Sequence, residues 1–160
     1  RVPLPEAAGS TIMFEYADSG KLIPMTIGSF AFIIKNGHEG CEACMESNAS
    51  PNIPAIIVPD RNNPKLTVNI SSSVKDIEKI IIGFEIAEKS GSCNFSRIDS
   101  PAVTVIINGE AKYFIRLEGL LLEKTVIAAE IYLHKGEWKM KTICAGHREN
   151  RSEIKSIYGL

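Results

Sequence analysis

The sequence predicts an all-β protein, a β-sandwich of two antiparallel sheets with a short C-terminal helix. About eight to ten short segments alternate apolar and polar residues, which is the period of a strand. Their spacing fits hairpins, above all at Asn108-Gly109, the strongest short turn signal. Only residues 151–158 have a helical period. Because the chain has no internal repeat or linker, residues 1–160 are expected to form a single domain.

The first half of the chain is expected to contribute five strands. The first is an edge strand, because the prolines around it lack the N–H that a central strand needs. The polar stretch 37–54 is rich in Gly, Ser and Asn and is expected to be a long irregular loop, either functional or mobile. The predicted strands are residues 2–4, 11–16, 27–35, 55–58 and 65–70.

The second half begins with a strand over residues 79–87. Its run of three isoleucines, Ile80 to Ile82, predicts that both faces are covered. Residues 88–99 are expected to be a second long loop. Residues 103–107 and 111–117 are expected to pair through the Asn-Gly turn.

Residues 124–140 predict a second hairpin with its turn at residues 134–136. Both faces of its first arm carry apolar residues, which predicts a central strand. Strict alternation would put Ile127, Ala129, Ile131 and Leu133 on one face. Trp138 in the second arm is expected to be a core anchor, with ligand stacking as the rival interpretation.

The last predicted element is a helix over residues 151–158. Ile154, Ile157 and Tyr158 lie at positions i, i+3 and i+4 and are expected to share its apolar face. Gly159 would end the helix.

Composition and charge exclude several classes of protein. Hydrophobic residues make up 44% and charged residues 23% of the chain, which is ordinary for a globular domain. The net charge of −1 gives no reason to expect nucleic acid as a partner. No apolar run is long enough to be a transmembrane segment. Four cysteines are too few for a disulfide scaffold, so a cytoplasmic location is expected.

Four segments carry a more specific signal. They are residues 68–86 (VNI, then IEKIIIGFEI), 93–105 (CNFS, then AVTV), 130–140 (EIYLHKGEWKM) and 154–160 (IKSIYGL). In order and spacing they resemble the motifs of the TerD family, bacterial proteins of tellurite resistance and stress response. The resemblance covers residues 66–160 well and the first third of the chain poorly. It implies the same fold, two antiparallel sheets packed face to face.

The resemblance also implies calcium as a possible cofactor. Calcium prefers six to eight oxygen ligands, and a tight site needs several carboxylates. Two family aspartates fall on Thr26 and Gly28, which have no carboxylate. The remaining candidate ligands for calcium are Asp60, Asn62, Asn63 and Glu88. We therefore expect a degraded calcium site with weak affinity, and the alternative is that the residues around Asp60 only form a turn.

A second candidate metal site is His38, Cys41 and Cys44. Two cysteines separated by two residues can chelate zinc, and Cys93 or His147 would supply a fourth ligand. A redox-active thiol pair and two uninvolved cysteines are the alternatives.

No catalytic motif appears in the sequence, so we expect a protein that is not an enzyme. The expected function is binding or assembly, with other proteins of a stress-response system as partners. The alternative is a metal-ion binding protein, holding calcium or zinc through the residues named above.

Overall fold

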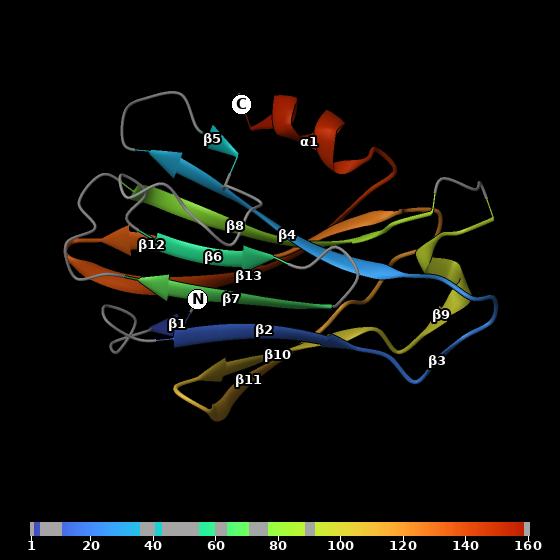
Figure 1. Ribbon diagram of the computed structural model, residues 1–160, viewed down its shortest axis with the longest axis horizontal. Helices are drawn as coiled ribbons and strands as arrows, with labels where there is room; N and C mark the ends of the chain where they lie inside the picture. The colour runs from blue at the N-terminus through green and yellow to red at the C-terminus, as the bar shows by residue number, and fades with distance from the viewer. Residues whose placement is uncertain are drawn as a thin grey trace.

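The computed structural model describes residues 2–3, 11–35, 41–42, 55–59, 64–70, 77–88 and 92–158. Within these ranges nearly every element is a strand, as Figure 1 shows. The strands are β1 (Val2–Pro3), β2 (Thr11–Ala17), β3 (Gly20–Lys21), β4 (Ile27–Lys35), β5 (Cys41–Glu42), β6 (Ala55–Pro59), β7 (Lys65–Ile70), β8 (Ile77–Ile86), β9 (Ile98–Asp99), β10 (Ala102–Ile107), β11 (Glu110–Arg116), β12 (Thr125–His134) and β13 (Glu137–His147). The helices are the 3₁₀ helix η1 (Phe95–Arg97) and the α-helix α1 (Arg151–Ile157).

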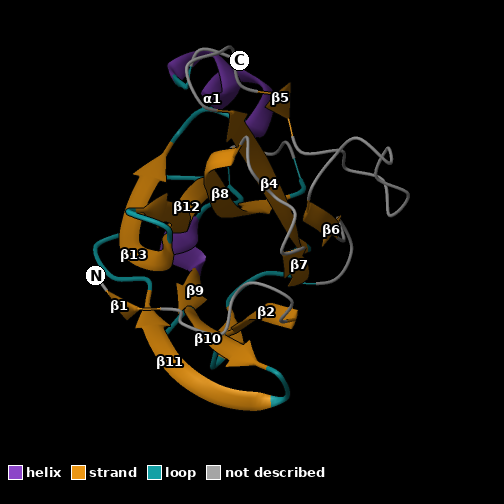
Figure 2. Ribbon diagram, turned by 90° about the vertical axis from the view of Figure 1, so that its left-hand side faces the viewer, coloured by secondary structure: helices purple, strands orange, loops and turns teal. Residues whose placement is uncertain are grey.

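The strands form two large antiparallel sheets that face each other (Figures 1 and 2). One sheet has six strands in the order β1-β13-β12-β8-β4-β5, and the other has five in the order β11-β10-β2-β7-β6. The short strands β3 and β9 pair separately. The predicted sandwich with one short C-terminal helix is therefore confirmed. Among the described helices, none is long and apolar enough to cross a membrane.

The main hydrophobic core lies between the two sheets. Phe14 and Leu66 from the five-stranded sheet are completely buried, as are Phe84 and Met140 from the six-stranded sheet. The same core holds Trp138, which confirms its expected role as an anchor. Burial of so many large apolar side chains is the main stabilising contribution to this fold.

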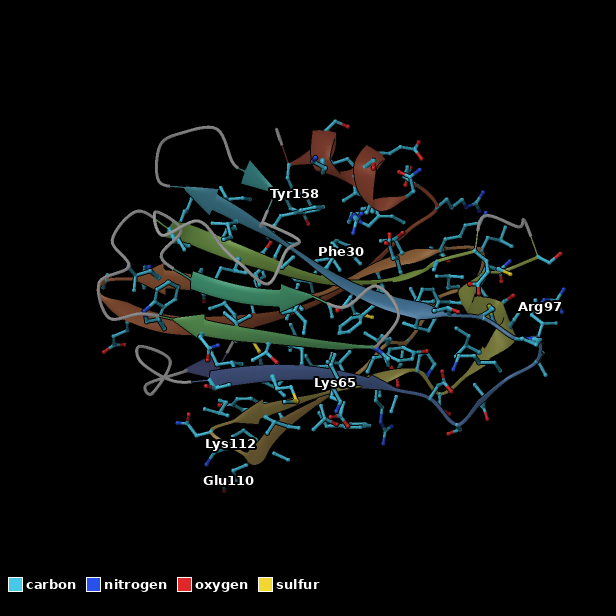
Figure 3. All side chains as sticks on the ribbon, viewed as in Figure 1. Phe30, Lys65, Arg97, Glu110, Lys112 and Tyr158 are labelled. Carbon is cyan, nitrogen blue, oxygen red and sulfur yellow. The ribbon has the colours of Figure 1, made fainter. Side chains whose placement is uncertain are left out.

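A second, smaller core lies on the outer face of the six-stranded sheet, beneath α1. It contains Phe30 and Phe32 from β4, Ile127 from β12 and Ile154 from α1, and Tyr158 packs at its edge. The rings of Phe32 and Tyr158 are 6.2 Å apart, and Figure 3 shows Tyr158 above the sheet. The six-stranded sheet is thus covered on both faces, as its apolar runs predicted.

Close packing in this second core depends on a glycine. Gly83 in β8 lies opposite Phe30 in β4, and the Phe30 ring lies over the Gly83 backbone. A Cβ atom at position 83 would overlap that ring. The absence of a side chain at Gly83 is therefore what lets Phe30 lie flat on the sheet.

The alternation predicted for β12 is wrong at one point. The register of β12 against both of its neighbours shifts between Ile127 and Ala129. Such a bulge reverses the faces on either side of it. Ile127 consequently packs under α1, whereas Ala128, Ala129 and Ile131 all belong to the main core.

Two other expectations also need correction. Residues 88–99 are not only a loop, because η1 and β9 occupy residues 95–99. Ile157 was expected on the apolar face of the helix but is 58% exposed. The reason is that α1 is short and turns only Ile154 fully toward the sheet, while Tyr158 reaches Phe32 from the end of the helix.

Candidate functional site

Thr26, one of the positions where the family resemblance places an aspartate, lines a cavity of about 450 Å³ near the end of β2 and the start of β4. Three chain segments meet there. Tyr16 lies near the end of β2, Asp18 directly follows that strand, and Lys21 belongs to β3. Thr26 precedes β4 and Pro64 precedes β7. The Tyr16 N–H donates to the Pro64 carbonyl at 2.8 Å and joins two of these segments.

Asp18 is the buried carboxylate of this site. Its side chain is only 7% exposed, and Lys21 Nζ lies 2.8 Å from its Oδ2. The Tyr16 hydroxyl donates a hydrogen bond to the same oxygen at 2.9 Å. A buried carboxylate needs both a counter-charge and hydrogen bonds, and the chain itself supplies both. The Lys21 ammonium therefore supplies the counter-charge of Asp18.

The environment of Tyr16 keeps its phenol protonated. Burial raises the pKa of Tyr16, and the hydrogen bond to Asp18 and the negative charge of Asp18 raise it further. Tyr16 is consequently a neutral hydrogen-bond donor, whose role is to hold Asp18 in place rather than to exchange a proton.

Glu88 is the one candidate calcium ligand that the described residues include. Its two carboxylate oxygens accept the Thr26 N–H at 2.8 and 3.0 Å. The Thr26 carbonyl in turn accepts the Ala87 N–H at 2.9 Å, so the two segments are locked together. Gly28, the other position where the family resemblance places an aspartate, lies within β4 opposite Glu85. Glu88 therefore holds the start of β4 in place.

The other candidate calcium ligands, Asp60, Asn62 and Asn63, lie outside the described residues. Asn69 in β7 accepts a hydrogen bond from the Thr11 hydroxyl at 2.7 Å and so links β7 to β2. The structure thus does not test the calcium set as a whole.

The candidate zinc ligands are described only in part. His38 and Cys44 lie outside the described residues, and for Cys41 the description covers only the backbone, which pairs with Ile33. Cys93 is buried in the main core and His147 ends β13. Within the described ranges, no three His, Cys, Asp or Glu side chains gather in a way that would hold a metal ion.

Sequence reasoning missed the pair of Asp18 and Lys21. In the sequence, Asp18 is one of several acidic residues that form no pattern, and nothing in a single sequence indicates that its side chain is buried. The only available signal is the spacing of three residues between an acid and a base in a turn after a strand.

With this geometry established, comparison with known proteins identifies similar chains. A sequence model described as TerD domain matches residues 57–158. The chain is 29% identical over 103 residues to "General stress protein 16U" of Bacillus subtilis (strain 168), a match that covers 62% of this chain and 53% of that protein. It is 25% identical over 105 residues to "Chemical-damaging agent resistance protein B" of Clostridium acetobutylicum, covering 63% of this chain and 76% of that protein. The match thus spans only about half the length of the general stress protein.

A solved structure shares the fold. The crystal structure of SCO6318 from Streptomyces coelicolor A3(2), described as a homologue of telluride resistance protein (TerD), superimposes with a TM-score of 0.67. The superposition covers 91% of this chain and 94% of that one, at 12% sequence identity. At this identity the likeness concerns the fold alone.

Proposed function

This chain belongs to the TerD domain family, and we propose that it is a non-enzymatic binding or assembly domain that works with other proteins of a bacterial stress-response system. The names of two relatives, a general stress protein and a chemical-damaging agent resistance protein, support this setting. We also propose a cytoplasmic location, which agrees with the free thiol of Cys93.

One observation carries the proposal that binding here does not depend on calcium. Among the described residues of the candidate cation site, each carboxylate already has a partner from the chain itself. Asp18 is paired with Lys21, and Glu88 accepts the Thr26 N–H. Lys21 supplies the counter-charge of Asp18, and Glu88 ties down the Thr26 backbone directly, so contacts within the chain already hold these segments together.

Exposed leucines at one end of the molecule support a role in binding proteins. Leu22 is 75% exposed, Leu121 is 65% exposed and Leu122 is 52% exposed. The Leu22 N–H donates to the Arg97 carbonyl, and the Leu121 carbonyl accepts the Ser96 N–H, both at 2.8 Å. Leu22 and Leu121 therefore lie beside η1, whose last residue Arg97 is labelled in Figure 3, and Leu122 follows Leu121 in the chain. We call Leu22, Leu121 and Leu122 the leucine end.

Exposed apolar groups that gather in one place commonly mark protein-binding surfaces. We propose that the leucine end contacts an apolar surface of a partner protein. Burial of one leucine stabilises a complex by about 1.5–3 kcal/mol, so loss of all three would weaken binding strongly.

The test is co-purification of partners from stressed cells with the wild-type protein and two variants, followed by mass spectrometry. In one variant the three residues of the leucine end are replaced by serine. The matched control is Phe114→Ser on β11, where Phe114 is 64% exposed. We expect the same defined partner with the wild type and the control, and its loss with the leucine variant. Equal recovery with all three proteins would refute the role of the leucine end.

A further inference from the structure

Within the described ranges, the two large sheets end in four edge strands, β1, β5, β6 and β11. Three of these edges are poorly suited to pairing with another chain. β1 and β5 have only two residues each, and β6 ends in Pro59, which has no N–H to donate. β11 differs from them, because it has seven residues without a proline and lies at the outside of the sandwich (Figures 1 and 2).

The hydrogen bonds between β11 and β10 show which backbone groups of β11 point outward. The Leu117 N–H, directly after the strand, donates to the Pro101 carbonyl at 2.9 Å. Antiparallel partners alternate between hydrogen-bonded and non-hydrogen-bonded pairs. The backbone groups of Ile115 therefore point toward β10, whereas the N–H and C=O groups of Phe114 and Arg116 point away from it. Among the described strands, only β10 pairs with β11, so this outer side is an open edge.

The side chains of the same two residues are exposed as well. Strand alternation puts Ile115 in the main core and leaves Phe114 and Arg116 on the outer face of the sheet. The Phe114 side chain is 64% exposed, although an aromatic ring normally gains stability by burial. A guanidinium that stacks on an aromatic ring is attracted to it. The edge thus presents two side chains that fit each other.

We propose that β11 pairs antiparallel with β11 of a second copy of this chain, around a twofold axis at Ile115. Phe114 of each copy then lies opposite Arg116 of the other copy, and each of these pairs exchanges both of its backbone hydrogen bonds. The outward backbone groups of both residues are then satisfied, and each guanidinium covers a ring. The proposal goes beyond the binding of other proteins and does not depend on the leucine end.

The charges on the strand disfavour the other twofold registers. An axis at Phe114 would place Arg116 opposite Lys112 of the other copy, and an axis at Arg116 would place two arginines opposite each other. Like charges directly opposite one another destabilise a strand pair. An axis at Tyr113 would need regular pairing through the bulge of β11, which lies between Ala111 and Tyr113. The proposed register avoids both problems.

The test is sedimentation equilibrium of the whole chain over a range of protein concentrations. We expect a reversible equilibrium of monomer and dimer without larger species, because a twofold pair uses both open edges. Phe114→Pro removes the ring and the outward N–H but leaves the bonds to β10 in place, and it should weaken the dimer about tenfold or more. The matched control is Leu121→Ser at the leucine end, where Leu121 is 65% exposed, and it should leave the dimer unchanged.

Cysteine variants test the register itself. Hydrogen-bonded partners in antiparallel strands have Cα atoms about 5.5 Å apart, a distance that a disulfide spans. A mixture of the Phe114→Cys and Arg116→Cys proteins should therefore form an intermolecular disulfide under mild oxidation faster than either variant alone. The mixed pair also keeps one contact between the remaining Phe114 and the remaining Arg116.

A chain that stays monomeric at every concentration would overturn the proposal. A dimer that Leu121→Ser weakens as much as Phe114→Pro would do the same, because the leucine end would then form the contact. Equal cross-linking of the mixture and of the single variants would show that the register is wrong. Thermal melts verify that each variant is folded, and if Phe114→Pro does not fold, the cysteine variants decide alone.

Discussion

Replacement of Lys21 by methionine would test whether the chain supplies its own cation. Lys21→Met removes the ammonium that lies 2.8 Å from Asp18, whose side chain is 7% exposed. Loss of one partner from a fully buried ion pair costs about 3–5 kcal/mol. Lys21 is 30% exposed and the Tyr16 hydroxyl remains, so we expect a smaller loss of about 2 kcal/mol in the free energy of unfolding. For a domain of this size that lowers Tm by about 4–8 °C.

The assay is a thermal melt of each variant with EGTA and with calcium. Lys112→Met is the matched control, because Lys112 lies 3.3 Å from Glu110 in a pair that is exposed. Figure 3 shows this pair near the lower edge of the molecule, at the hairpin of β10 and β11. An exposed pair contributes less than about 1 kcal/mol, so the control should change Tm little.

Two further results would sharpen the interpretation. Calcium should raise the Tm of Lys21→Met more than that of the wild type, because the variant leaves Asp18 without a cation. Addition of Asp18→Asn to Lys21→Met should restore most of the lost stability, since the buried charge is then gone. The reasoning would be refuted if Lys21→Met lowered Tm no more than Lys112→Met does.

Other substitutions test the packing, the titration and the capping of the fold. Gly83→Val should destabilise the domain by about 1–3 kcal/mol in urea unfolding, because its side chain would overlap the Phe30 ring; an unchanged midpoint would contradict this packing. The raised pKa of Tyr16 makes its folded form resist ionisation, so part of the stability present below about pH 10 is lost at higher pH, where the unfolded tyrosine ionises first. In Tyr16→Phe, the free energy of unfolding should therefore fall less between pH 8 and pH 11 than in the wild type, as measured by urea unfolding of both proteins. Parallel pH profiles of the two proteins would show that Tyr16 does not contribute. Asn150→Ala breaks the capping box of α1 and should lower stability by about 1 kcal/mol in a thermal melt, whereas an unchanged Tm would mean that α1 does not depend on its cap.

The strands could be predicted from the sequence because each has one face, or two, that must be apolar. The structure gives the predicted bounds of Ile27–Lys35 and Lys65–Ile70 without change. The bulge beside Ala128 could not be predicted, since it depends on how β12 pairs with two neighbours at once. Alternation within one strand contains no information about its partners, so Ile127 was placed on the wrong face.

The candidate site was less predictable than the fold. A resemblance points to positions where a carboxylate is missing, such as Thr26, but it does not show what replaces it. The pairing of Glu88 with the Thr26 backbone joins segments that are distant in the sequence. Asp18 and Lys21 are only three residues apart, but nothing in the local sequence shows that their side chains meet. Burial of Asp18 also follows from packing that no local pattern encodes.

The position of α1 on the six-stranded sheet has a consequence for how the protein is made. As a nascent chain leaves the ribosome, β4 and β8 emerge long before Ile154, the side chain that finally covers Phe32 and Ile81. β2 likewise cannot pair with β10 until late in synthesis, because five other strands of the two large sheets lie between them in the sequence. Such non-local pairing makes folding slow, about milliseconds to seconds, and leaves strand edges open during synthesis. The exposed strand edges therefore make the protein most prone to aggregation during its synthesis, before α1 has closed over the sheet.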